Sequence, residues 1–209
     1  MDAVIASPMP SFQRTLQREG ITLPRTPLEI LQVNLTARCN LACTHCHVES
    51  GPRRTEALDA RGIARLIELM GTAPALNTLD LTGGAPELHP HFREMVRAGR
   101  ERGLKVIDRC NLTVLFEPGQ EGTAAFLAAQ GVAVVASLPC YTPENVNKQR
   151  GKGVFGQSIE ALQKLNALGY GQAGSGLDLD LVYNPIGARL PPSQAALEDD
   201  YRKRLHEDF

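Results

Sequence analysis

Apolar and polar residues change their spacing several times along the chain, and each change predicts the start of a new strand or helix. Alternation with period two is typical of strands, whereas apolar residues at i, i+3, i+4 and i+7 are typical of one face of a helix. The expected strands span residues 29–35, 76–82, 104–108, 132–137 and 177–183, and the expected helices span residues 59–70, 90–103, 121–130 and 155–168. The pattern amounts to five βα units in series.

Local signals mark the ends of these helices. Asp59 is suited to cap the first helix, because an Asp side chain accepts hydrogen bonds from the free N–H groups of a first turn. Pro90 lies near the first turn of the second helix, and glycines follow three of the helices, at Gly103, Gly131 and Gly169. Each expected helix therefore carries at least one residue that favours one of its ends.

The two ends of the chain lie outside the series of βα units. Residues 12–18 predict one or two helical turns, so residues 1–28 are interpreted as a leader and residues 29–209 as the core. An amphipathic helix is expected at the C-terminus, where apolar residues recur every fourth position at Leu197, Tyr201, Leu205 and Phe209. Because no helix-ending signal follows, we expect a further segment to come after Phe209 in related chains.

The faces of the strands indicate the architecture. In the first strand, Gln32 and Asn34 alternate with Val33 and Leu35, and the second and fifth strands show the same alternation. A doubly wound sheet has helices on both faces and nearly continuous apolar strands, whereas a barrel with outer helices has one polar face. The sequence thus favours an α/β fold, a partial (βα) barrel of parallel strands with outer helices. Edge strands that face water would alternate in the same way.

Composition narrows the choice of partner. The 209 residues suffice for one substantial domain, and 22 basic against 23 acidic residues leave a net charge of −1. That balance gives no reason to expect a nucleic acid or an anionic membrane as partner. The sequence shows neither a secretory signal nor an apolar stretch long enough to span a bilayer, so we expect a cytoplasmic protein.

Three of the five cysteines, Cys39, Cys43 and Cys46, fall within eight residues directly after the first expected strand. In a parallel barrel this is the face on which sites are built. Three thiolates can hold an iron–sulfur cluster of four irons and leave one iron free for chemistry. A zinc site is the alternative, because Cys43 and Cys46 form a C-x2-C pair that His45 or His47 could complete.

The C-x3-C-x2-C spacing in this loop resembles the signature of the radical S-adenosylmethionine (radical SAM) enzymes. The resemblance implies a 4Fe-4S cluster held by Cys39, Cys43 and Cys46, with S-adenosylmethionine bound to the free iron. It also implies a reducing electron donor such as flavodoxin or ferredoxin, and reductive cleavage to a 5′-deoxyadenosyl radical. The family usually places an aromatic residue before the last cysteine, where this chain has His45, which would meet the adenine.

Further positions are expected to hold S-adenosylmethionine. Gly83 and Gly84 end the second strand, where glycine lets the backbone approach a ligand, although a plain βα turn has the same composition. The resemblance implies a Gly-Gly-Glu-type segment here that binds the methionyl amine, with Ala85 in place of Glu. Polar residues expected at the same face of the barrel are Asn111, Ser137, Gln149 and Arg150, the last two in a loop. Ordinary turn residues and a solvated basic loop are the alternatives for them.

Cys110 and Cys140 are the two thiols outside the motif, and both follow strand ends. The segments 109–113, 136–141, 149–153 and 181–185 resemble the arsenosugar-biosynthesis branch of the radical SAM enzymes. That resemblance implies a small-molecule arsenical substrate, a dimethylated trivalent arsenic that receives the adenosyl group, and a C-terminal domain absent here. Cys110 and Cys140 are then hypothesised to handle the arsenic catalytically, although buried structural cysteine is the commoner role.

Three functions therefore remain open. The first is a radical transferase that acts on an arsenical, with a radical SAM enzyme acting on a peptide or cofactor precursor as its alternative. The second is a non-catalytic iron–sulfur module that binds the cofactor. The third is a zinc-stabilised structural domain. Iron and sulfide content separates the third from the others, and production of 5′-deoxyadenosine separates the first from the second.

Overall fold

The computed structural model describes residues 11–188 and 190–209, so residues 1–10 of the expected leader lie outside it. Strands and helices alternate along the chain, and two short 3-10 helices lie among them. In chain order the elements are α1 (Phe12–Arg18), β1 (Ile30–Thr36), α2 (Ala60–Thr72), β2 (Thr78–Gly83), η1 (Pro86–Leu88), α3 (Phe92–Glu101), β3 (Lys105–Asp108), η2 (Thr113–Phe116), α4 (Thr123–Ala129), β4 (Ala133–Ser137), α5 (Pro143–Arg150), α6 (Val154–Ala167), β5 (Leu179–Val182) and α7 (Gln194–Asp208).

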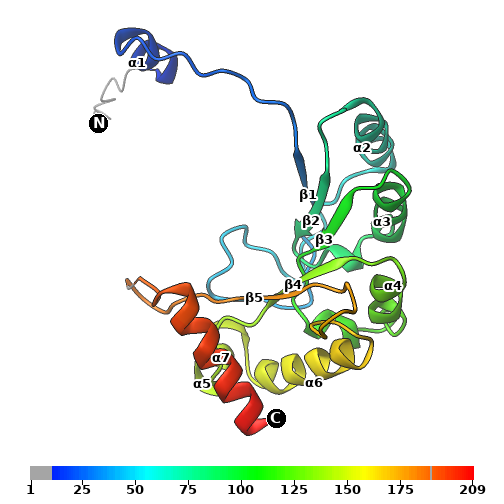
Figure 1. Cartoon of the computed structure of the whole chain (residues 1–209), viewed down its shortest axis with the longest axis vertical. Helices are drawn as coiled ribbons and strands as arrows, with labels where there is room; N and C mark the ends of the chain where they lie inside the picture. The colour runs from blue at the N-terminus through cyan, green and yellow to red at the C-terminus, as the bar shows by residue number, and fades with distance from the viewer. Residues whose placement is uncertain (1–10, 189) are drawn as a thin grey trace, which may run out of the picture.

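The five strands form one parallel sheet in the order β1-β2-β3-β4-β5, which is also their order along the chain. A doubly wound sheet would reverse its strand order at a switch point, and this sheet does not. Helices α2, α3, α4 and α6 lie along one side of the fanned strands (Figure 1). The expected partial barrel with outer helices is confirmed.

Each strand divides its side chains between the helices and the open side of the sheet. Leu79 of β2 and Val106 of β3 are fully buried, and both lie against Gly99 of α3, where a Cβ atom would stand only 3.0 and 2.9 Å from them. On the opposite face, Asp80 lies between polar neighbours instead. The polar positions recognised in the sequence therefore line the inner face of the partial barrel.

Two expectations about the elements need correction. All five strands begin one or two residues later than expected, because residues such as Leu76 and Leu104 are buried in the core without pairing in the sheet. The expected loop after β4 is in fact α5, so Gln149 and Arg150 lie in the last turn of a helix. The segment has only one buried apolar side chain, Val146, and therefore shows no helical period.

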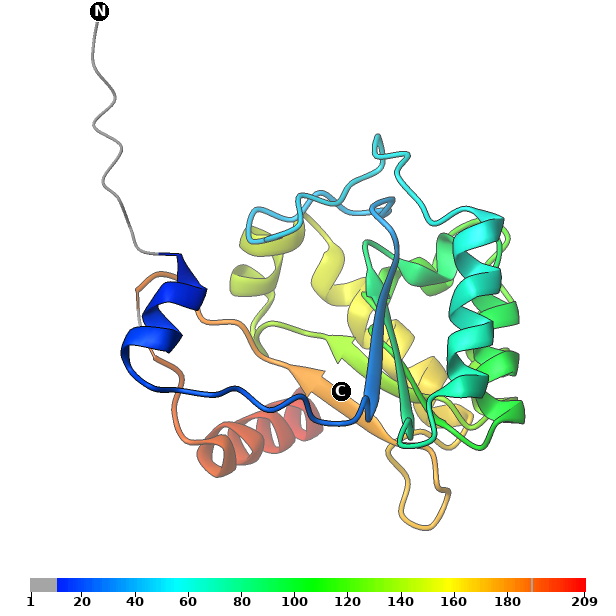
Figure 2. The ribbon, with the colours of Figure 1, turned by 90° about the horizontal axis from the view of Figure 1, so that it is seen from above.

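Helix α7 confirms the amphipathic helix expected at the C-terminus. Tyr201 is its buried residue, and its hydroxyl donates a hydrogen bond of 2.6 Å to the carbonyl oxygen of Leu138, just after β4. Helix α1 is separated from the sheet by an extended segment (Figures 1 and 2). None of the helices in the described residues is both long enough and apolar enough to cross a membrane.

We expect Tyr201→Phe to lower the free energy of unfolding by about 1 kcal/mol, because the buried carbonyl of Leu138 loses its donor. Tyr141→Phe is the matched control, since the Tyr141 hydroxyl reaches Asp200 at 3.4 Å in an exposed contact. Urea unfolding of both variants checks the difference. Equal stabilities would mean that the hydrogen bond does not help to hold α7.

Candidate functional site

The three clustered cysteines lie in a long loop between β1 and α2, at the carboxyl end of the parallel strands (Figure 2). Cys39 is buried, whereas Cys43 and Cys46 are half-buried. The backbone N–H of Leu41 donates to the Cys39 sulfur at 3.4 Å, and the N–H of Ser50 donates to the Cys46 sulfur at 3.3 Å. Such donors stabilise thiolates and orient them as ligands.

Contacts from distant segments hold this loop in place. The Thr44 N–H and hydroxyl both donate to the carbonyl oxygen of Gln149, at 2.9 and 3.2 Å. At the base of the loop, Arg38 pairs with Gly51 in a short bridge. The loop is therefore fixed both to the end of β1 and to the end of α5.

The distances between the three loop sulfurs can be compared with those that a single zinc ion requires. Tetrahedral zinc with sulfur at 2.3 Å would bring its ligand sulfurs to about 3.8 Å from one another. Among the described residues, Glu87, Asp108 and Cys110 bring one ligand atom each to within 4.8 Å of one another. The three loop cysteines do not form such a group. The sulfurs of Cys39, Cys43 and Cys46 therefore do not all lie within 4.8 Å of one another, which is a wider arrangement than the sulfurs around one zinc ion have.

Asn111 was expected to bind S-adenosylmethionine, and the structure places it against Cys39. Its amide nitrogen donates to the Cys39 sulfur at 3.3 Å and to the side-chain oxygen of Asn40 at 2.7 Å. Asn40 in turn donates to the hydroxyl of Thr113 at 3.0 Å. The position of Asn40 directly after Cys39 was the one sign in the sequence that Asn40 belongs to the site. The hydrogen-bond partners of Asn40 lie more than 70 residues away in the chain, so the network itself could not be predicted.

Opposing effects act on the thiols. Burial raises the pKa of Cys39 and of Cys43 above the ordinary thiol value. Hydrogen bonds from Leu41 and Asn111 lower the pKa of Cys39, and the charge and hydrogen bond of Arg150 lower that of Cys43. Since the thiolate is the ligating form, these donors favour metal binding by thiols that burial alone would keep protonated.

Gly83 and Gly84 bring β2 against the start of the cysteine loop. The Gly84 N–H donates to the carbonyl oxygen of Thr36 at 2.7 Å, and the N–H of the buried Ala85 donates to that of Arg38 at 2.8 Å. A Cβ atom on Gly83 would collide with the Thr36 oxygen, and one on Gly84 with the Arg38 oxygen. Close backbone approach therefore requires both glycines.

Arg150 is buried, so the solvated-loop alternative for it is wrong. Its guanidinium donates to the carbonyl oxygens of Ser137 and Asn111, the latter at 2.7 Å. The side-chain amide of Gln149 exchanges hydrogen bonds with Asn184, at 3.2 and 2.9 Å. The polar residues expected to hold the cofactor thus join the ends of β3, β4 and β5 beneath the loop. His45, by contrast, is exposed between Cys43 and Cys46.

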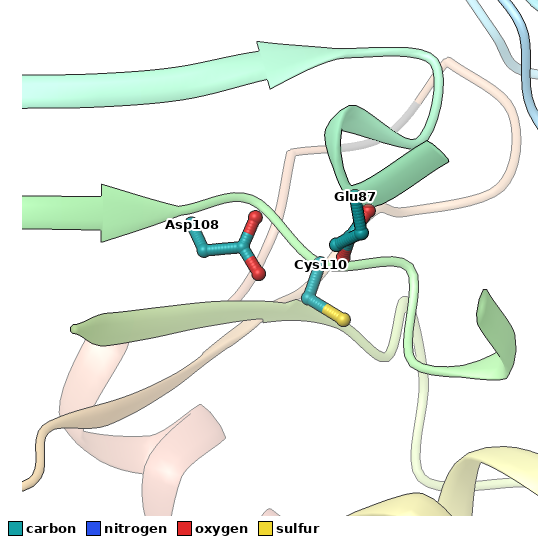
Figure 3. A group of neighbouring side chains, drawn as sticks. All are labelled: Glu87, Asp108 and Cys110. Carbon is teal, nitrogen blue, oxygen red and sulfur yellow. The ribbon is translucent and has the colours of Figure 1, made fainter. Parts of the chain in front are cut away.

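The two remaining cysteines occupy different surroundings. Cys140 is buried at the wall of a cavity of about 280 Å³, which Tyr183 and Asn184 also line. Its sulfur accepts a hydrogen bond from Asn145 at 3.4 Å. Cys110 is fully buried beside Glu87 and Asp108 (Figure 3). Of the two, Cys140 is the one placed for contact with a ligand.

An ion pair on the inner face of the sheet was missed in the sequence. The Arg109 guanidinium donates to both carboxylate oxygens of Asp80, at 2.8 Å each, and Gln32 donates to the same carboxylate at 2.8 Å. Asp80 is almost fully buried, whereas the Arg109 side chain is 42% exposed. The ion pair therefore fixes the guanidinium on the inner face with part of it exposed.

A sequence profile of the radical SAM superfamily matches residues 33–179, from β1 to β5, including the three loop cysteines, Gly83 and Gly84. The chain belongs to the radical SAM superfamily. Radical SAM enzymes use a 4Fe-4S cluster and S-adenosylmethionine, and these are the cofactors of the family to which the chain belongs.

The curated relatives match this chain over a minor part of their own length. Mycofactocin maturase MftC of Mycobacterium ulcerans is 32% identical over 139 residues, which are 66% of this chain and 37% of that protein. The GTP 3',8-cyclase of Chlorobaculum tepidum is 34% identical over 73 residues, which are 35% of this chain and 22% of that protein. The chain thus spans well under half the length of these relatives.

Solved structures share the fold. Streptococcus suis SuiB bound to S-adenosylmethionine matches with a TM-score of 0.63 and 17% identity, over 92% of this chain and 41% of SuiB. The enzyme anSMEcpe with bound AdoMet and a peptide matches with a TM-score of 0.59 and 18% identity, over 76% of this chain and 43% of that one. At such low identity the likeness establishes the fold alone.

We expect Asn111→Ala to shift the reduction potential of a bound radical SAM cluster to more negative values, because a hydrogen bond to a ligand sulfur is lost. The affinity of the protein for iron should fall by about 10- to 100-fold, which is the usual effect of removing a hydrogen-bond partner of a metal ligand. An EPR-monitored redox titration and iron analysis measure the two effects. Asn145→Ala removes the equivalent amide from Cys140 and should change neither, so a shift in that control would contradict the assignment.

Proposed function

We propose that this chain binds a 4Fe-4S cluster through Cys39, Cys43 and Cys46 and reductively cleaves S-adenosylmethionine. The observation that carries the proposal is the loop itself, in which the three thiols follow a backbone segment that packs directly on Gly83 and Gly84. When bound and reduced, the cluster supplies the electron that splits the sulfonium into methionine and a 5′-deoxyadenosyl radical. An external reductant such as flavodoxin or ferredoxin would provide that electron.

The residues around the loop have separate tasks in this proposal. Asn111 and the Leu41 N–H hold the Cys39 thiolate, and Arg150 favours the thiolate of Cys43 by its positive charge. Gly83 and Gly84, packed closely on the backbone of Thr36 and Arg38, fix the position of the segment proposed to bind the methionyl amine. Exposed His45 remains the proposed adenine contact, through its backbone.

For the substrate, we propose a peptide or a cofactor precursor. The relatives named above are a maturase and a GTP cyclase, a further relative is the Bacillus subtilis subtilosin biosynthesis protein AlbA, and SuiB is also matched in its complex with a precursor peptide. The exposed part of the Arg109 guanidinium, which Asp80 leaves free, suits a carboxylate or phosphate of such a substrate, because guanidinium N–H groups donate to both. A 5′-deoxyadenosyl radical would take a hydrogen atom from it and leave as 5′-deoxyadenosine.

One observation favours a second candidate, transfer of the deoxyadenosyl group to a dimethylated trivalent arsenical. Cys140 presents a thiol at a cavity of about 280 Å³, large enough for a small molecule. Trivalent arsenic is a soft acceptor that binds soft sulfur ligands. Cys110, buried away from this cavity, is less suited to such contact, so the arsenical candidate rests on Cys140.

An anaerobic assay separates these functions. The reconstituted protein is reduced with dithionite and given S-adenosylmethionine, alone, with dimethylarsinite, or with a library of candidate peptides, and the products are followed by mass spectrometry. 5′-Deoxyadenosine that depends on Cys39, Cys43 and Cys46 supports the radical mechanism, and an adenosyl–arsenic adduct supports the second substrate. Bound cluster without any cleavage product would indicate a cofactor-binding module and overturn the proposal.

A further inference from the structure

Glu87, Asp108 and Cys110 form a closed group at the carboxyl ends of β2 and β3. Glu87 lies in η1, Asp108 ends β3, and Cys110 follows two residues later; Figure 3 shows the three side chains gathered together. One ligand atom from each side chain lies within 4.8 Å of the other two. Their exposed fractions are 4%, 0% and 0%, so the group is sealed from solvent.

Neither carboxyl group has a partner outside the group of three. All four carboxylate oxygens of Glu87 and Asp108 are buried without a hydrogen-bond donor from another residue, and within the described residues neither group takes part in a salt bridge. Burying an ionised carboxylate without a partner costs several kcal/mol or more. The two groups must therefore either keep their protons or share a cation, and burial raises the pKa of both.

The placement does not follow from the radical chemistry. Asp108 lies two residues after Val106 and so on the same face of β3, the face that packs against the helices. Arg109 lies with Asp80 on the inner face. The S-adenosylmethionine proposal uses none of these three side chains. Their convergence from two segments onto one point needs a separate account.

The donor atoms indicate which cation fits. Carboxylate oxygen with thiolate sulfur is a mixed hard and soft set that suits a borderline ion such as zinc, and not Mg²⁺ or Ca²⁺, which prefer oxygen alone. Zinc with sulfur at 2.3 Å and oxygen at 2.0–2.2 Å places its ligand atoms about 3.3–3.8 Å apart. Small side-chain rotations from the present spacing reach that geometry, and a bidentate carboxylate supplies the fourth ligand atom.

We propose that Glu87, Asp108 and Cys110 bind one structural Zn²⁺, separate from the iron–sulfur site. The ion neutralises the two buried carboxylates and ties the end of β2 to the end of β3. Because Gly83 and Gly84 precede Glu87 and Asn111 follows Cys110, the zinc site fixes the segments that contact the cysteine loop. Since no path from solvent is open, the ion enters as the chain folds.

The test removes competing thiols and uses Co²⁺ as a spectroscopic probe. The full chain with Cys39, Cys43 and Cys46 all changed to Ala is unfolded in urea and refolded with increasing Co²⁺, first alone and then in competition with Zn²⁺. We expect one equivalent of Co²⁺, a thiolate-to-cobalt charge-transfer band and the intense visible bands of tetrahedral cobalt, all displaced by zinc. Cys110→Ser in this background should abolish the charge-transfer band, whereas the matched thiol control Cys140→Ser should keep it. Absence of the band, or its loss only in Cys140→Ser, would overturn the proposal.

A second measurement does not depend on that background. The wild-type protein with its cluster intact should contain one zinc in addition to the cluster iron, as found by elemental analysis. The isosteric change Asp108→Asn should weaken zinc binding at least about 100-fold while the cluster iron remains. Zinc should also raise the melting temperature of wild-type protein and not of Asp108→Asn. Equal zinc contents in the two proteins would show that Asp108 is not a ligand.

Discussion

Cys43→Ala is expected to eliminate the iron–sulfur cluster and to reduce 5′-deoxyadenosine production to background. Two thiolates cannot hold a four-iron cluster, and no fourth thiol is in reach, because Cys110 and Cys140 lie buried in other surroundings. The same loss is expected for Cys39→Ala and Cys46→Ala. Iron and sulfide analysis with EPR of the reduced protein measures the cluster, and mass spectrometry measures the product.

Cys140→Ala is the matched control for that change. It also removes one buried or half-buried thiol, yet Cys140 contacts Asn145 and Thr142 and none of the loop cysteines. The control should keep the full iron content and the S-adenosylmethionine cleavage. Full iron in Cys43→Ala, or loss of iron in Cys140→Ala, would mean that the ligands have been assigned to the wrong thiols.

The order of the elements could be predicted from the sequence because each has its own period. The strands alternate in steps of two, and Asp59, predicted to cap α2, accepts the Gly62 N–H at 2.7 Å as expected. Helix α5 was not predicted because it is short and mostly polar. Its formation depends on Pro143 in the first turn and on contacts with the cysteine loop. A period cannot reveal a helix that buries so few apolar residues.

The site could be predicted only as far as local spacing determines it. The three cysteines lie within one loop, so their spacing alone indicated the cluster. Asn111 and Arg150 were recognised as polar residues near the right strand ends, but their partners are Cys39 and backbone carbonyls. Those contacts join segments distant in the chain, and only the fold brings them together.

The buried pair Glu87 and Asp108 shows a different limit. A charged residue in a strand is ordinarily placed on the wet face, and Asp80 does lie on the inner face, where Arg109 neutralises it. Asp108 instead shares the register of Val106 and faces the helix layer. The register was available from the sequence, but the arrival of Glu87 and Cys110 beside it was not.

Gly84→Ala is expected to have the second largest effect, because the close contact between β2 and the cysteine loop leaves no room for a methyl group. The added Cβ would collide with the Arg38 carbonyl oxygen and stand 2.7 Å from its carbon and 2.9 Å from the oxygen of Ala37. These neighbours are backbone, so relief requires the end of β1 to move, and Cys39 moves with it. We expect a loss of about 1–3 kcal/mol in the free energy of unfolding, together with loss of the cluster and of S-adenosylmethionine binding.

Gly156→Ala separates this steric effect from the general effect of adding a methyl group. Gly156 lies in α6 with nothing within 4 Å of a built Cβ atom, so Ala there should stabilise the protein by about 0.5–1 kcal/mol through helix propensity. Urea unfolding, iron analysis and equilibrium binding of S-adenosylmethionine compare the two variants. If Gly84→Ala keeps the cluster and binds the cofactor as wild type does, the backbone of Gly84 is not part of the site. Loss of the cluster in Gly84→Ala alone would instead show that the position of Cys39 depends on a glycine 45 residues further along the chain.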